Sequence, residues 1–201
     1  MLQNRVDPRG RIIKTSARGA WMGNRGLLHD DRREIVRPFR LKAWITCLLE
    51  FKGWKREVMK PNRYTELFFL DEATSFAAGH RPCAECRRMD FNRWKMAWLA
   101  GNPSYGFKVR TSIREIDAIL HVERLVRDGS FTSPIGELPD GCFVECRGVP
   151  CLVARGSIFP WTPFGYEKGI EVDEREVAPV LTPGSLVRSF RAGYIPQMSV
   201  G

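Results

Sequence analysis

The pattern of hydrophobic and polar positions changes character along the chain. Residues 1–35 contain several arginine–glycine pairs and little apolar periodicity, which predicts a basic, flexible arm. After the arm, short runs of β-branched and aromatic residues predict the strands of a small antiparallel sheet. These runs cover residues 43–49, 55–59 and 64–70.

Capping residues predict the first two helices. Asp71 is a suitable N-cap for a short helix over residues 72–78, and Gly79 is placed to end that helix. A longer helix is expected over residues 85–100, where three large aromatic side chains recur on one helical face. Such a stripe is more typical of a packed core than of a ligand-binding surface.

The second half of the chain begins as a helix and then changes to a β pattern. Ser112 and Glu115 have the spacing of a capping box, which predicts a helix that continues to Gly129. Residues 141–146 and 151–155 alternate as strands do and flank a four-residue turn, so they predict a β-hairpin.

Together these elements predict an α+β fold in three parts. A basic flexible arm over residues 1–35 precedes a unit over residues 36–101, in which a small antiparallel sheet and short helices surround a Cys-x-x-Cys motif. Residues 102–201 are expected to form a helix and a small β-hairpin unit, packed on the preceding unit as one domain. This last part should also contain a helix over residues 185–192.

Cys83 and Cys86 are the strongest chemical feature of the sequence. Their Cys-x-x-Cys spacing allows one tight turn to present two thiolates to a tetrahedral zinc ion. Arg81, Arg87 and Arg88 surround the pair and are expected to stabilise its thiolates electrostatically. Six cysteines in 201 residues are too few for a disulfide-stapled secreted scaffold. We therefore expect a structural Zn²⁺ site, with a redox-active dithiol as the alternative.

The stretch before and including this motif resembles a known zinc module. Residues 67–88 read as a strand, a short helix and then Ala-Gly, a ring, Arg-Pro and Cys-x-x-Cys, an order similar to the C-terminal half of the Ada-type zinc-binding module. The resemblance implies a zinc-stabilised unit that acts on DNA, in repair or processing. Members of this family use the zinc structurally or let one zinc-bound cysteine accept a methyl group from a DNA phosphotriester. The early Cys-x-x-x-Cys of the family is missing here.

Two sets of residues could supply the remaining zinc ligands. The first set, Cys47 and His29, is preferred because it keeps the order of the resembled module. The second set is Cys146 and Cys151, which flank the turn of the predicted hairpin. Each residue also has a simpler explanation, since the cysteines could be buried packing residues and His29 an exposed loop side chain.

Positive charge is concentrated at the start of the chain. Residues 1–60 contain 15 Lys and Arg against 6 Asp and Glu, and the remaining residues contain 17 of each, so this segment accounts for the net charge of +9. A basic segment of this kind can follow a phosphate backbone without reading base sequence. The expected partner is nucleic acid, with DNA favoured over RNA. A non-catalytic scaffold that binds an acidic protein partner is the alternative.

Several classes of protein are disfavoured by what the sequence lacks. No apolar run approaches the roughly 20 residues of a membrane-spanning helix, and the first residues are too polar for a signal peptide. A cytoplasmic protein with no membrane partner is therefore expected. No P-loop, nucleophile elbow or His-Glu-x-x-His motif marks an enzyme. Two enzymatic alternatives stay open: Cys47 as a methyl-accepting thiolate, and an unrecognised nuclease or repair activity.

Overall fold

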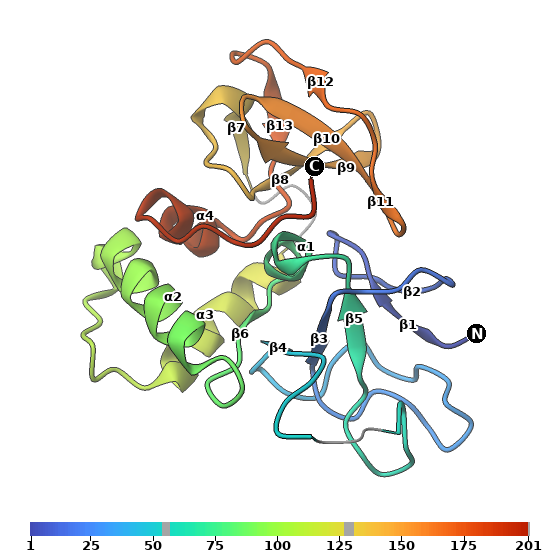
Figure 1. The fold of residues 1–201 in the computed structure, drawn as a ribbon. Helices are drawn as coiled ribbons and strands as arrows, with labels where there is room; N and C mark the ends of the chain where they lie inside the picture. The colour runs from blue at the N-terminus through green and yellow to red at the C-terminus, as the bar shows by residue number, and fades with distance from the viewer. Residues whose placement is uncertain (54–56, 127–130, 201) are drawn as a thin grey trace.

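The computed structural model describes residues 1–53, 57–126 and 131–200, and it is an α+β structure with four α-helices among these residues. Figure 1 shows the N-terminal strands and the C-terminal strands at opposite ends of the molecule, with the short helix α1 (Glu72–Ala77) between them and the longer helices along one side. No helix in this described part of the chain is long and apolar enough to cross a membrane.

The N-terminal sheet has six short strands in the order β2-β1-β5-β3-β4-β6. It is a mixed sheet rather than the purely antiparallel sheet predicted, because β1 runs parallel to β5 and β4 runs parallel to β6. The strands are β1 (Gln3–Val6), β2 (Ile12–Lys14), β3 (Trp21–Asn24), β4 (Ile45–Cys47), β5 (Leu67–Phe69) and β6 (Arg81–Pro82).

Residues 1–35 are part of this sheet and do not form the flexible arm predicted for them. They supply β1, β2 and β3, and Val6 and Leu28 are buried in a cluster with residues of β5. Each strand has only three or four residues, which is too short to produce a visible apolar period. Gly23 permits the close packing of β3, because a Cβ at this position would lie 2.4 Å from the carbonyl oxygen of Ile45.

The strands predicted over residues 43–49 and 64–70 exist but are shorter than expected. They correspond to β4 and β5, which are separated in the sheet by β3 instead of pairing with each other. The strand predicted over residues 55–59 begins in residues 54–56, which lie outside the described residues, and residues 58 and 59 form a turn.

The helices lie close to the predicted positions, and Gly129, the predicted end of the third helix, lies outside the described residues. The Asp71 carboxylate accepts a hydrogen bond of 2.8 Å from the backbone N–H of Thr74, as an N-cap should. Ser112 and Glu115 form the predicted capping box at the start of the third helix. The helices are α1 (Glu72–Ala77), α2 (Arg88–Gly101), α3 (Ile113–Leu125) and α4 (Gly184–Arg191), with 3₁₀ turns at Pro103–Tyr105 and Ile135–Glu137.

The C-terminal part contains the predicted hairpin and more strands than expected. The hairpin is β8–β9, and its turn is the two residues Arg147 and Gly148, both with positive φ (50° and 81°), rather than four residues. Further strands extend this sheet to β10, β11 and β12, while β13 pairs with β7. The strands are β7 (Thr132–Pro134), β8 (Phe143–Cys146), β9 (Val149–Ala154), β10 (Ser157–Thr162), β11 (Gly165–Tyr166), β12 (Ile170–Glu171) and β13 (Val177–Pro179).

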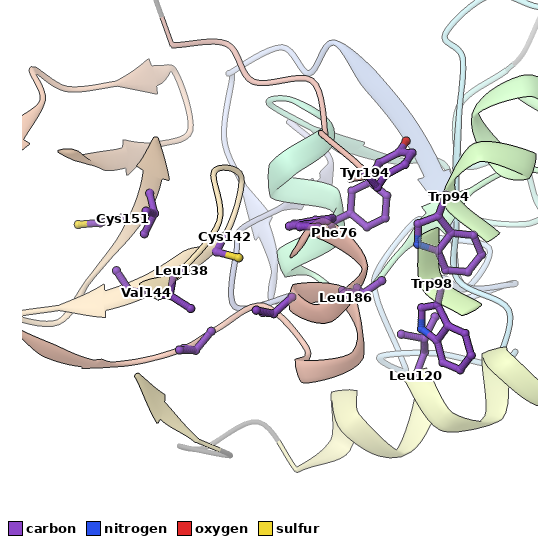
Figure 2. Close-up of a cluster of buried hydrophobic side chains, with 14 of the residues drawn as sticks. Phe76, Trp94, Trp98, Leu120, Leu138, Cys142, Val144, Cys151, Leu186 and Tyr194 are labelled. Carbon is purple, nitrogen blue, oxygen red and sulfur yellow. The ribbon is translucent and has the colours of Figure 1, made fainter. Parts of the chain in front are cut away.

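One hydrophobic cluster joins the helices to the C-terminal sheet. Figure 2 shows it extending from the tryptophans of α2, past α1 and α4, to the cysteines of the hairpin region. Burying these large side chains contributes on the order of 2 kcal/mol each to folding. Members labelled in the figure are Phe76, Trp94, Trp98, Leu120, Leu138, Cys142, Val144, Cys151, Leu186 and Tyr194.

Candidate metal centre

Two neighbouring strands bring Cys47 and Cys83 together. Cys47 is the last residue of β4, and Cys83 directly follows β6. The two strands are parallel with Thr46 opposite Pro82, and the N–H of Cys83 donates a 2.9 Å hydrogen bond to the carbonyl oxygen of Thr46. The strand register therefore carries both cysteines to the same end of the sheet edge, although they are far apart in sequence.

The end of α1 fixes where β6 begins. Gly79 has a φ of +78°, and a Cβ there would come within 2.6 Å of the Arg124 side chain, so this position requires glycine on both grounds. The next side chain, His80, is fully buried, with its ring centroid 4.7 Å from that of Phe69 and 5.3 Å from that of Trp44. A rigid helix end thus directs the chain into β6 and toward the Cys-x-x-Cys turn.

Backbone hydrogen bonds hold the sulfurs of the turn. The N–H of Glu85 lies 3.4 Å from the Sγ of Cys83, and the Leu48 backbone forms a hydrogen bond with Cys86. Backbone donors directed at sulfur favour the thiolate form, which is the form that binds metals. The Sγ atoms of Cys47, Cys83 and Cys86 all lie within 4.8 Å of one another. We call these three residues the cysteine cluster.

The cysteine cluster is mostly enclosed by apolar groups. Cys47 is 7% exposed and Cys83 is 8% exposed, while Cys86 is partly open to solvent. Met22, directly opposite Cys47 in the β3–β4 pair, packs against the cluster, and nothing in the sequence pattern singles this residue out. Because several thiolates in an apolar site are costly without a counter-charge, such a group suits a bound cation.

The three sulfurs influence one another's protonation. A hydrogen bond with Cys83 raises the pKa of Cys47, and hydrogen bonds with Cys47 and Cys86 lower the pKa of Cys83. The cluster therefore shares its remaining protons among closely spaced sulfurs. A metal ion would displace these protons, so metal binding at this site should strengthen as the pH rises.

The arginines around the motif hold the loop rather than act on the thiolates alone. Arg81 makes two hydrogen bonds, of 2.8 and 2.7 Å, to the buried Asp117 of α3. Arg87 forms a 2.5 Å ion pair with the buried Glu72 of α1. Arg88 is exposed. The charges of the two buried arginines are thus balanced by carboxylates, which sequence spacing alone did not reveal, and both pairs fasten the Cys-x-x-Cys loop to helices.

The structure does not bring His29 to the cysteine cluster. Its Nδ1 lies 2.6 Å from the hydroxyl of Thr65 and its Nε2 lies 3.3 Å from the carbonyl oxygen of Lys60. The cause is the direction of β3, since Met22 lies beside Cys47 at one end of β4 and the chain leaves β3 at the other end. His29 is also buried, at 4% exposure, and is not the exposed loop residue considered as its simpler role.

The rival pair, Cys146 and Cys151, lies in the β8–β9 hairpin at a separate place. Val144 is opposite Cys151, and Cys146 is opposite Val149, so the two thiols are diagonal neighbours on one face of the hairpin. A hydrogen bond with Cys151 lowers the pKa of Cys146. Among the described residues, this pair does not join a third potential ligand in a compact group.

All six cysteines are free thiols, and Cys142 has a packing role. Its side chain is fully buried in the main hydrophobic cluster, and burial raises the pKa of its thiol.

Comparisons with known proteins found no relative of this chain. No protein-family model matches this sequence, and no curated protein or solved structure matches it. Function must therefore be argued from the residues themselves.

Proposed function

We propose that this chain is a zinc-stabilised nucleic-acid-binding protein, with Cys47, Cys83 and Cys86 as zinc ligands. The observation that carries the proposal is the gathering of three cysteine sulfurs within 4.8 Å of one another. Zinc suits this donor set because it accepts thiolates in tetrahedral sites. Bonds of about 2.3 Å from zinc to sulfur place the sulfurs of one tetrahedron roughly 3.8 Å apart. The side chains would need only small movements to close on one ion.

The proposed role of the zinc is structural. Cys47 belongs to β4, whereas Cys83 and Cys86 lie between β6 and α2, so an ion bound by all three would fasten the sheet edge to the start of α2. The low exposure of Cys47 and Cys83 limits the access of a large substrate to their sulfurs. A structural zinc contributes its binding free energy directly to folding. Three protein ligands leave one coordination position for water or another donor.

The proposed nucleic-acid surface is the basic N-terminal region. Most of the arginines and lysines of this region are exposed, so they are available to phosphates, which such side chains bind without reading base sequence. The resemblance of residues 67–88 to Ada-type modules favours DNA and a role in repair or processing. The exposed basic residues include Arg11, Lys14, Arg18, Arg32, Arg33, Arg37, Arg40, Lys42, Lys52 and Lys60.

Metal content tests the zinc site. Protein purified under reducing conditions without chelator should contain about one zinc per chain by elemental mass spectrometry. The zinc should be lost in Cys83→Ser and Cys47→Ser and kept in Cys146→Ser, a matched control because Cys146 is likewise a thiol that lies beside another cysteine. The absence of zinc from the unmodified protein, or its loss only in Cys146→Ser, would contradict the assignment.

Salt dependence tests the nucleic-acid surface. Affinity for single- and double-stranded DNA should fall steeply with salt. For a duplex, the slope of the logarithm of affinity against the logarithm of salt concentration should become shallower by about 0.9 for each phosphate contact removed. The exposed Lys14 and Arg18 are suitable for alanine substitution, with the exposed Arg110 and Arg114 as controls in the helical part. Binding to an acidic protein without any binding to DNA or RNA would favour the scaffold alternative.

Cys47 as a methyl acceptor is the second candidate, and its membership of the cysteine cluster is the observation that favours it. Zinc coordination would keep the Cys47 sulfur as a nucleophilic thiolate, which its raised pKa otherwise opposes. The test is the intact mass of the protein after incubation with DNA that carries methyl phosphotriesters. Addition of one methyl group at Cys47 would establish the activity, and an unchanged mass with zinc-loaded protein would exclude it.

A further inference from the structure

A second feature of the N-terminal half is a cavity of about 520 Å³ between the β1–β2 turn, residues 35–39 and the end of α3. Five arginines contribute to its lining, and no aspartate or glutamate is among the described lining residues. We call this cavity the arginine pocket. Its arginines are Arg9, Arg11, Arg25, Arg37 and Arg124.

Two of these arginines form a fixed floor. The guanidinium carbon of Arg25 lies 3.9 Å from the centre of the Trp44 ring, and that of Arg124 lies 4.6 Å from it. Backbone carbonyls hold both groups in place: Arg25 donates to Gly10, at 2.9 Å, and Arg124 donates to Gly79, at 2.6 Å. Cation–π contacts and hydrogen bonds therefore orient two positive charges before any ligand arrives.

The other three arginines form the rim. Arg9 forms an ion pair with Glu145, and Arg11 forms one with Asp7, so carboxylates that are not part of the lining hold these two lining side chains in place. Arg37 is exposed, and it lies just after the β-bridge between residues 29 and 35. Because Arg25 and Arg124 are only 1% and 2% exposed, a ligand would contact the rim arginines and be attracted by the buried charges beneath them.

An apolar wall completes the pocket. It includes Ile12, Ile35, Phe39 and Leu125. The ring of Phe39 is half-buried and packs edge-on against the ring of His121, with 4.8 Å between the ring centres. The wall therefore offers an apolar surface beside the arginines, which suits a ligand that carries both a ring and an anionic group.

We propose that the arginine pocket binds one nucleoside monophosphate unit, with the phosphate on the rim arginines, above the positive charges of the buried floor, and the base against the apolar wall. The unit is either the phosphorylated end of a nucleic-acid strand or a free mononucleotide. The first source rests on the proposed function, because it makes the pocket a receptor for strand ends within the nucleic-acid surface. The second source does not depend on that function.

The charge and size of the pocket favour a terminal phosphate over a phosphate within a strand. A terminal phosphomonoester carries about two negative charges near neutral pH and has three oxygens that can accept hydrogen bonds, whereas a backbone phosphodiester carries one charge. Arginine recognises such groups with paired N–H donors. A cavity of about 520 Å³ is of the size that holds one small ligand and is too small for a duplex.

The experiment compares short single-stranded DNA with a phosphate at the 5′ end, at the 3′ end or at neither end, together with free deoxynucleoside monophosphates and inorganic phosphate. Binding is measured by calorimetry for the full chain and for Arg37→Glu and Arg25→Gln. Arg37 is exposed, so its variant tests the pocket without disturbing the packed floor, and Arg110→Glu applies the same charge change to an exposed residue elsewhere. One phosphorylated end should bind about tenfold more tightly than the unphosphorylated strand. This advantage should be lost in both pocket variants and kept in the control.

The outcomes separate the pocket from the proposed function. Equal binding of all three strands, with no binding of mononucleotides, would overturn the pocket and leave DNA binding by the exposed basic surface in place. Binding of mononucleotides that depends on Arg37, without binding of any strand, would support the pocket and overturn nucleic-acid binding. Inorganic phosphate bound as tightly as a mononucleotide would overturn the assignment of the base to the apolar wall.

Discussion

The protein brings cysteines together in two places, and the two groups are built differently. In the cysteine cluster, a parallel strand pair places Cys47 beside Cys83, and a tight turn then adds Cys86. In the β8–β9 hairpin, Cys146 and Cys151 are neighbours because antiparallel strands place alternate residues on the same face. A hairpin supplies two thiols readily, whereas a third requires another segment of chain.

The surroundings of the two groups differ as well. Backbone N–H groups and apolar side chains surround the cluster. Carboxylates surround the hairpin pair, where the negative charges of Glu145 and Glu176 oppose the ionisation of Cys146. Glu167, from the loop after β11, has the same effect on Cys151. The comparison teaches that cysteine spacing alone does not define a metal site, because the third donor and the nearby charges decide what the sulfurs can bind.

The largest expected effect comes from removing the metal from the cluster. Chelation, or the substitution Cys83→Ser, should lower the free energy of unfolding by about 5 kcal/mol, because a structural zinc contributes binding energy to the folded state alone. Thermal unfolding monitored by circular dichroism, with and without chelator, measures the loss. Cys146→Ser should change stability by less than about 1 kcal/mol and keep its sensitivity to chelator. Equal losses in both variants would remove the distinction between the two groups.

The next largest effect should come from the buried ion pair that holds the cluster loop. Arg87→Met leaves the Glu72 carboxylate buried among the remaining donors from Tyr194 and Gln197, and it should cost about 3 kcal/mol. The matched control is Arg88→Met, since Arg88 is the adjacent residue and is exposed; its cost should stay within about 0.5 kcal/mol. Denaturant unfolding of the two variants measures the difference. If Arg87→Met unfolded at the same denaturant concentration as the control, the loop would not depend on this pair.

Local signals in the sequence predicted the helices well. Asp71 and the Ser112 capping box mark helix starts correctly, because each is an interaction between residues three positions apart. Gly79 marks the end of the first helix, and this signal is local too, because it depends on a single residue that must adopt a positive φ. The β8–β9 hairpin was also predicted, because its strands are adjacent in sequence.

Long-range pairing was the part that could not be predicted. β6 has only two residues, so nothing in its sequence indicates that it pairs with β4 and thereby positions Cys47. The same limit explains why His29 was expected near the metal, because the direction in which β3 passes β4 is not visible in the sequence. The arginine pocket combines Arg9, Arg25 and Arg124, which are separated by up to 115 positions in the sequence, and it has no local signature.

A smaller effect concerns the reactivity of the hairpin pair. The hydrogen bond from Cys151 lowers the pKa of Cys146 and raises that of Cys151, so the Cys146 thiolate forms at lower pH than in a free cysteine and should react with iodoacetamide before Cys151 does. Cys151→Ala removes the donor and should move the rate profile of Cys146 to higher pH, with a rate about tenfold lower near neutral pH for each unit of pKa. Cys151→Ser keeps a hydroxyl donor and serves as the control. Zinc-loaded protein should show no alkylation of the cysteine cluster under the same conditions.

The smallest effect is expected from Glu145→Gln, which removes an ion pair between the two halves of the molecule. Arg9 and Glu145 are 23% and 27% exposed at their side chains, so their interaction is partly screened by solvent and should contribute at most about 1 kcal/mol. The substitution also removes a negative charge that raises the pKa of Cys146, so Cys146 should alkylate slightly faster near neutral pH. Glu85→Gln makes the same change at an exposed position within the Cys-x-x-Cys turn. It should change neither the free energy of unfolding nor the alkylation rate of Cys146. A slower reaction of Cys146 in Glu145→Gln would show that the carboxylates around the hairpin pair do not control its ionisation, and the electrostatic contrast between the two cysteine groups would fail.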